Sequence, residues 1–291
     1  MKKRTKNKTD KTTLLLTALS VLLIAVFLFS GYKLLSTLLE YRKAASTYSD
    51  LSGAVVSNRN TAGGASAASS GTPGFSGTPG ANTNTGTQAH SGGQQTAAQP
   101  LEHSPIEVDF SALLARNRDV VGWIYSPDTV INYPVVQGSD NDYYLHRLID
   151  GTWNPSGSIF VDVRNPLCFD GRSAILYGHH MNDGSMFASI VNYKNQAYYN
   201  EHPNLYLNTP SGNYRLAVFR GFVTYADSSV YTFDFTDDAD FLDYVGKMKG
   251  FSDFNSEVTV AATDRIAVLS TCTYEYDDAR YVIFAKMIPI A

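Results

Sequence analysis

Residues 266–286 read IAVLSTCTYEYDDARYVIFAK. Two apolar runs rich in β-forming residues flank a polar loop, a pattern typical of a β-hairpin. Cys272 ends the first run and Arg280 begins the second. Because the ends of two paired antiparallel strands can be close neighbours, the hairpin predicts a thiol and a guanidinium group side by side.

Short β-like runs continue through residues 105–291, where Tyr and Phe are frequent. Many short strands with helices inserted between them predict a mostly β (α+β) fold, a closed or nearly closed β-barrel with helical decoration. Strands are expected near residues 120–126, 131–137, 157–162, 173–179, 204–208, 213–225, 265–272 and 280–288. Helices are expected at residues 107–116, 139–147, 184–194 and 237–249, the last with Asp237 as its N-cap.

The N-terminal region has the pattern of a membrane anchor. Residues 1–11 carry six basic side chains and one acid, and residues 14–29 carry no charge. The uncharged run with its flanks is about long enough to span a bilayer as a helix, and the preceding basic cluster predicts a cytoplasmic N-terminus. A cleaved signal peptide is the alternative, disfavoured by the length of the run and the lack of a clean small-x-small site.

A second change of composition follows. Residues 52–100 consist mainly of Gly, Ser, Thr, Ala, Asn and Gln, with GTPG twice and Arg59 as the one formal charge. Such a segment buries too little apolar surface to fold, which predicts a flexible tether. The expected parts are a basic cytoplasmic tail (1–11), a transmembrane signal-anchor (12–35), a juxtamembrane helix (36–51), a flexible Gly/Ser/Thr-rich linker (52–104) and a folded domain (105–291).

Charge and cysteine content exclude some functions. The whole chain carries −4 and residues 1–11 carry +5, so the remainder carries −9, which argues against a nucleic-acid partner. Cys168 and Cys272 are the two cysteines. They do not form a Cys-x-x-Cys pair, so metal binding through cysteine is disfavoured.

A working thiol needs a base or a positive neighbour. His179 and His180 end the apolar run SAILYGHH, and adjacent strand residues face opposite ways, so one of the two can point at a shared site. Arg280 could donate to an oxyanion on a substrate carbonyl. The residues alone leave open that Cys272 is a small buried residue and that Arg280 forms an ordinary surface ion pair.

Several segments in order resemble one family. YGHHMNDGSMF (177–187), LSTCTYE (269–275) with the following Arg280, and GWIYSPDTVINYPVVQGSDNDYYL (122–145) are similar to signatures of the sortases, most closely of class B. The resemblance covers essentially all of residues 107–289. It implies an eight-stranded β-barrel with N-terminal helices and an inserted helix before a late strand.

The resemblance also implies roles for individual residues. His179 is implied as the catalytic histidine, Cys272 as the nucleophile, and Arg280 as the group that stabilises substrate and intermediate. The family's substrate groove maps onto four further positions, namely Asn141, Leu145, Tyr177 and Ser270. The segment 226–256 is expected to shape substrate choice.

The implied reaction is cell-wall transpeptidation. The thiol attacks the carbonyl of a Thr in a C-terminal sorting signal of the Asn-Pro-x-Thr-Asn or Pro-x-Thr-Gly type, and a peptidoglycan or pilin amine resolves the thioacyl enzyme. No cofactor or metal is implied. The implied partners are sorting-signal-bearing surface proteins, the amine acceptor and the membrane, with the enzyme on the outer face of the cell membrane. A hydrolytic cysteine peptidase, a pilin-polymerising enzyme and a non-catalytic surface-binding module remain as alternatives.

Overall fold

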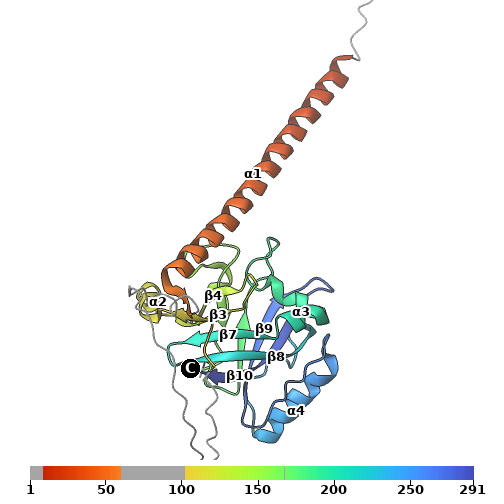
Figure 1. The fold of residues 1–291 in the computed structure, drawn as a ribbon. Coiled ribbons are helices and arrows are strands. Elements are labelled where there is room, and N and C mark those ends of the chain that lie inside the picture. The colour runs from red at the N-terminus through yellow and green to blue at the C-terminus, as the bar shows by residue number, and fades with distance from the viewer. Residues whose placement is uncertain (1–8, 60–101, 167) are drawn as a thin grey trace, which may run out of the picture.

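The hairpin of residues 266–286 is formed by strands β9 (Arg265–Cys272) and β10 (Ala279–Ile290), which pair antiparallel. The computed structural model describes residues 9–59, 102–166 and 168–291. Within them eight strands close into a barrel in the order β10-β8-β7-β3-β4-β5-β6-β9, and Figure 1 labels six of these strands. The six further barrel strands are β3 (Val120–Tyr125), β4 (Asn132–Val136), β5 (Ile159–Val161), β6 (Ser173–Tyr177), β7 (Asn204–Thr209) and β8 (Gly212–Tyr225).

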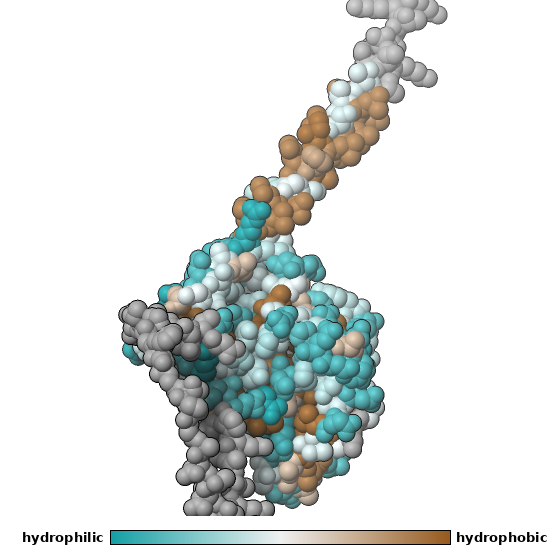
Figure 2. All heavy atoms as spheres, viewed as in Figure 1, coloured by the Kyte–Doolittle hydropathy of each residue, from teal (hydrophilic) through white to brown (hydrophobic). Residues whose placement is uncertain are grey.

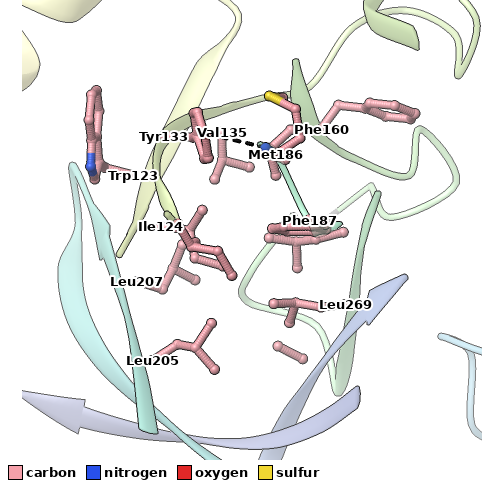
Figure 3. Packing of buried hydrophobic residues seen from close by; sticks show 14 of the residues in the cluster. Trp123, Ile124, Tyr133, Val135, Phe160, Met186, Phe187, Leu205, Leu207 and Leu269 are labelled. Atoms are coloured by element: carbon pink, nitrogen blue, oxygen red, sulfur yellow. Dashed lines mark hydrogen bonds between the residues drawn. The ribbon is translucent and has the colours of Figure 1, made fainter. Parts of the chain in front are cut away.

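The barrel is mostly antiparallel, and two of its pairings are parallel. β4 pairs parallel with β5, and β6 pairs parallel with β9. Each predicted strand segment is a strand in the structure, with ends shifted by a few residues. Figure 3 shows the interior, where side chains such as Ile124, Leu205 and Leu207 are fully buried because they point inward from alternate strand positions.

The helices differ more from the prediction. The segment 107–116 is a short strand, β2 (Ile106–Val108), followed by helix α2 (Phe110–Arg116), whose first turn Asp109 caps through the amide of Ala112. The segment 139–147 is not a helix, and only the 3₁₀ turn η2 (Tyr144–His146) forms there. The side chain of Asp140 accepts from the amides of Asp142 and Tyr143, and this local bonding competes with a helix.

The other two predicted helices fare differently. Residues 184–194 form a 3₁₀ helix, η3 (Ala188–Lys194), which starts late because Gly184 adopts φ +82° in a turn. Helix α3 (Gln196–Glu201) follows and was not predicted. Helix α4 (Asp238–Met248) is as predicted, with Asp237 accepting from the amide of Asp240, and the turn η4 (Lys249–Phe251) follows it. α4 packs Phe241, Tyr244 and Met248 on the outside of the barrel.

Helix α1 (Thr9–Val55) is longer than the predicted anchor and juxtamembrane helix together. Its first part projects from the barrel as an apolar rod, brown in Figure 2, and within the described residues it is the one helix long and apolar enough to cross a membrane. Its last turns pack on the barrel instead. Four of their side chains are buried in the barrel's main hydrophobic cluster: Ala44, Tyr48, Leu51 and Val55.

This packing corrects the predicted start of the linker at residue 52. Helix α1 continues to Val55, and strand β1 (Val56–Asn58) pairs antiparallel with β2. The apolar Leu51, Val55 and Val56 keep this part of the chain ordered, because they face the domain core and not water. Most of the predicted linker, residues 60–101, lies outside the described residues.

Candidate functional site

Cys272 and Arg280 are direct partners in the β9–β10 ladder. The prediction that the hairpin brings the two side chains together is therefore confirmed, and both are half-buried at the barrel's edge. Glu275 in the connecting loop pairs with Lys194. Among the described residues no carboxylate lies within ion-pair distance of Arg280, so its guanidinium can bind a substrate group.

The parallel pairing of β6 with β9 brings the histidine segment to the same edge. Tyr177 pairs with Ser270, and the chain leaves the strand at Gly178, whose amide donates to the carbonyl of Ser270 at 3.1 Å. A Cβ at Gly178 would lie 2.4 Å from Ile159 and 2.7 Å from the ring of Phe187, so only glycine fits there. The next residue, His179, therefore lies just beyond the strand end, beside the Cys272 end of β9.

His179 is held by one hydrogen bond and one stacked ring. Its Nε2 lies 2.7 Å from the carbonyl oxygen of Leu145, and its ring stacks on that of His146 with centroids 5.7 Å apart. In the neutral ring this bond assigns the proton to Nε2 and leaves Nδ1 free to accept. Burial lowers the pKa of His179, and the nearby His146 and Arg280 lower it further, while the bond to Leu145 opposes them. The neutral form is therefore favoured.

His180 points elsewhere, as the alternation of side chains predicts. Its Nδ1 lies 2.9 Å from the carbonyl oxygen of Cys272, and its ring packs near Tyr274. His180 therefore supports the backbone of Cys272, and it does not line the pocket described next.

A cavity of about 210 Å³ opens at this edge of the barrel. It brings together all seven residues singled out from the sequence: Asn141, Leu145, Tyr177, His179, Ser270, Cys272 and Arg280. Five lining residues were not named from the sequence: Phe160, Gly178, Ala226, Tyr231 and Thr271. Ala226 and Tyr231 belong to the segment expected to shape substrate choice, but no local pattern marks them, because they reach the pocket through long-range packing.

A buried carboxylate fixes one wall of the pocket. Asp162 is fully buried and accepts hydrogen bonds from Asn141, Tyr177 and Arg164 at 2.7–3.1 Å. Burial alone raises the pKa of a carboxyl group, but here the bonds from Arg164, Asn141 and Tyr177 outweigh burial and lower the pKa of Asp162 to about 2. Asn141 and Tyr177 are thereby held in place before any substrate binds. Beside Tyr177, the hydroxyls of Tyr231 and Ser270 lie 2.9 Å apart.

Cys168 lies outside the pocket. It sits in a turn with φ +49°, and burial together with nearby Asp170 raises the pKa of its thiol to about 12. It is therefore a protonated, unreactive thiol at neutral pH. Both cysteines are free, and among the described residues no group of three or more His, Cys, Asp or Glu side chains is placed to hold a metal ion.

Comparisons with known proteins all indicate one family. Residues 124–288 match the model of the Sortase domain family. The chain is 30% identical to Sortase B of Staphylococcus aureus over 278 residues, covering 95% of this chain and 98% of that one. It is 40% identical to Sortase B of Listeria monocytogenes over 174 residues, covering 59% of this chain and 71% of the relative. The structure of a Staphylococcus aureus sortase B–substrate complex is similar with a TM-score of 0.59 and 37% identity, covering 62% of this chain and 85% of that one.

Proposed function

The chain belongs to the sortase family, as a class B member, and on that premise we propose that it cleaves a C-terminal sorting signal after Thr and joins the released protein to a peptidoglycan amino group. One observation carries the proposal. A thiol, an imidazole and a guanidinium line one pocket, on Cys272, His179 and Arg280, and within the described part of the chain the guanidinium has no carboxylate partner. A thiol needs both a base and an oxyanion donor within reach to form an acyl enzyme.

In the proposed first step, Cys272 transfers its proton to His179 and its sulfur attacks the Thr carbonyl carbon. Arg280 donates to the oxyanion that forms. When the C–N bond breaks, the imidazolium gives its proton to the leaving amine, and a thioacyl enzyme remains. The lowered pKa of His179 supports this sequence, because a neutral ring can accept the thiol proton and an acidic imidazolium readily returns it.

In the second step an acceptor amine attacks the thioester. His179, again neutral, takes a proton from the incoming amine, and Cys272 leaves as the thiolate. The product is an amide, so the peptide bond that was broken is replaced by one of similar energy and no external energy source is needed. Water in place of the amine would give hydrolysis, which is why the nature of the acceptor separates a transferase from a peptidase.

The pocket walls support a narrow peptide substrate. We propose that Asn141, Leu145, Tyr177 and Ser270 contact the sorting signal, with Tyr231 beside Tyr177 and Ser270. Asp162 holds Asn141 and Tyr177 rigid, and a rigid wall reduces the entropy lost on binding. An Asn-Pro-x-Thr-Asn sequence is the proposed signal.

The proposed location is the outer face of the cell membrane. The basic residues before the apolar part of α1 favour a cytoplasmic N-terminus, and the barrel follows on the other side. We propose that the anchor is retained in the mature protein, with the basic tail at residues 1–11 and the membrane segment within residues 12–35.

The test is to trap and follow the acyl enzyme. Full-length protein in detergent micelles is mixed with an Asn-Pro-x-Thr-Asn peptide, and mass spectrometry locates the adduct. We expect a thioacyl adduct on Cys272, none in Cys272→Ala, and a rate about 10²–10⁴-fold lower in His179→Ala. Added amine should convert the product from acid to amide.

The outcomes separate the alternatives. An adduct with a hydrolytic product even at high amine concentration indicates a peptidase. Binding of the peptide without any adduct indicates a non-catalytic module and refutes the proposed role of Cys272. An active His179→Ala variant refutes the proposed role of the histidine.

A further inference from the structure

Near the end of helix α1, Tyr48 packs against the part of the barrel that surrounds the pocket. This side chain is 4% exposed, and its hydroxyl donates to the carbonyl oxygen of Gly157 at 2.6 Å and lies 2.9 Å from the hydroxyl of Ser158. Its ring meets the ring of Tyr133 edge to face, with centroids 5.3 Å apart. Tyr48 therefore touches two separate parts of the barrel, and each part leads to His179.

The first connection runs through the loop that holds the imidazole nitrogen. The amide of Ser158 donates to the carbonyl of Tyr144 at 2.9 Å, and Gly157 lies against Leu145 so closely that a Cβ there would be 2.4 Å from the Leu145 oxygen. That same oxygen accepts from Nε2 of His179. A shift of the Gly157 backbone would therefore move the atom that orients the imidazole ring.

The second connection runs through the loop that follows the histidine. The hydroxyl of Tyr133 accepts from the amide of Met186 at 3.1 Å, the dashed line in Figure 3. Met186 has φ +57°, a strained value for a side chain of this type, and forms an isolated bridge with His180. The amide of Phe187 then donates to the carbonyl of His179 at 2.9 Å. The backbone of His179 is thus tied to the ring on which Tyr48 packs.

We infer that Tyr48 is a positioning residue for His179, so that the helix carrying the apolar N-terminal run also sets the orientation of the catalytic imidazole. The inference rests on the proposed role of His179. It adds to that role because nothing about the thiol, imidazole and guanidinium requires a residue of α1. Tyr48 thus acts on His179 at two points. One is the imidazole nitrogen, through Leu145, and the other is the His179 backbone, through Phe187.

The experiment compares two buried tyrosines in the full-length protein in detergent micelles. Tyr48→Phe removes the hydroxyl that holds Gly157 and keeps the ring. Tyr193→Phe is the matched control, because Tyr193 is 2% exposed and its hydroxyl donates to the carbonyl of His202, also at 2.6 Å, in η3 and α3. Each variant loses one buried bond from a tyrosine hydroxyl to a carbonyl, and Tyr48→Phe also loses the 2.9 Å contact with the Ser158 hydroxyl, so its loss of stability should be somewhat larger.

The two variants should differ in catalysis. For Tyr48→Phe we expect kcat for peptide cleavage to fall about tenfold with little change in KM, because the ring is misplaced while the β9 wall and Arg280 are untouched. Hydrogen–deuterium exchange should become faster in residues 143–146 and 179–187. Tyr193→Phe should change neither kcat nor exchange in these segments.

Equal kcat values for the two variants, or unchanged exchange at 179–187 in Tyr48→Phe, would overturn the inference. Should Tyr48→Phe not fold, Tyr133→Phe serves instead, since it removes the acceptor for Met186 alone and should lower kcat with faster exchange at 179–187. His179→Ala separates this result from the proposed function. If His179→Ala is inactive while Tyr48→Phe and Tyr133→Phe match wild type, only the role of Tyr48 fails, whereas an active His179→Ala refutes the mechanism itself.

Discussion

Leu51 offers a direct test of whether the end of α1 belongs to the folded domain. Its side chain is 2% exposed and lies in the barrel's main hydrophobic cluster, although the sequence places it at the edge of a low-complexity segment. Truncating a leucine buried to this degree costs about 2–5 kcal/mol. Domain stability is about 5–15 kcal/mol, so Leu51→Ala should remove a large share of it.

Leu39→Ala on the same helix is the matched control, because it is the same substitution at a side chain that is 55% exposed. We expect that control to alter the unfolding free energy by about 0.5 kcal/mol or less. Urea unfolding of the full-length protein in mild detergent can be followed through Trp123, whose indole donates to Asn132, itself bonded to Ser52 of α1. Identical midpoints for the two variants would refute the reasoning and show that the helix end contributes nothing to the barrel.

Three further predictions concern the thiols, the guanidinium and the buried carboxylate. Iodoacetamide at about pH 8 should modify Cys272 and spare Cys168. With a pKa of about 12, only about 10⁻⁴ of the Cys168 side chain is thiolate at this pH. Equal labelling of the two cysteines on peptide maps would contradict this prediction. Arg280→Lys should lower kcat/KM about 10²–10³-fold, because a flexible ammonium does not replace a planar donor fork, while Arg265→Lys in a surface ion pair should stay near wild type in the same peptide assay. Asp162→Asn should lower the free energy of unfolding by about 2 kcal/mol at neutral pH. In the folded protein the pKa of Asp162 lies below the ordinary value of about 4, so the carboxylate stabilises the fold fully above pH 4 and stops doing so as the pH falls towards about 2. The difference in unfolding free energy between wild type and Asp162→Asn should therefore shrink over this range. A difference that stays constant in unfolding titrations would exclude this role of Asp162.

The barrel was predictable because its signals are local. Each strand carries its own β-forming run and its own boundary residues, and the hairpin at Cys272 and Arg280 is closed by a short polar loop. The helical segments were less predictable. Asp140 and Gly184 favour turns over helix through their own side-chain bonding and backbone freedom, and these preferences compete with the apolar spacing around them.

In the pocket, too, residues with a local sequence signal were predicted and residues placed by long-range packing were not. The residues proposed to carry the chemistry lie at or just beyond strand ends and are visible in the sequence, and the motif resemblance named four more lining positions. Tyr231 and Phe160 were missed because they reach the pocket only through the closure of the barrel. The docking of α1 was missed for a related reason. The apolar positions 44, 48, 51 and 55 do recur at helical spacing, but they are few, and a long polar segment follows them.

The pairing of β1 with β2 changes what the segment between them can do. The β1–β2 pairing holds the residues on either side of 60–101 at one place on the domain, so in the proposed topology the length of this segment does not set the distance from membrane to pocket. That distance is set by helix α1, which makes its first bond to the barrel at Glu40, where Asn154 donates to its carbonyl and carboxylate. From Lys33, the first charge after the apolar run, the helix rises about 10 Å to that point. In the proposed topology the pocket would lie at one fixed height above the lipid, and we expect a sorting signal and its acceptor amine to meet within that thin layer.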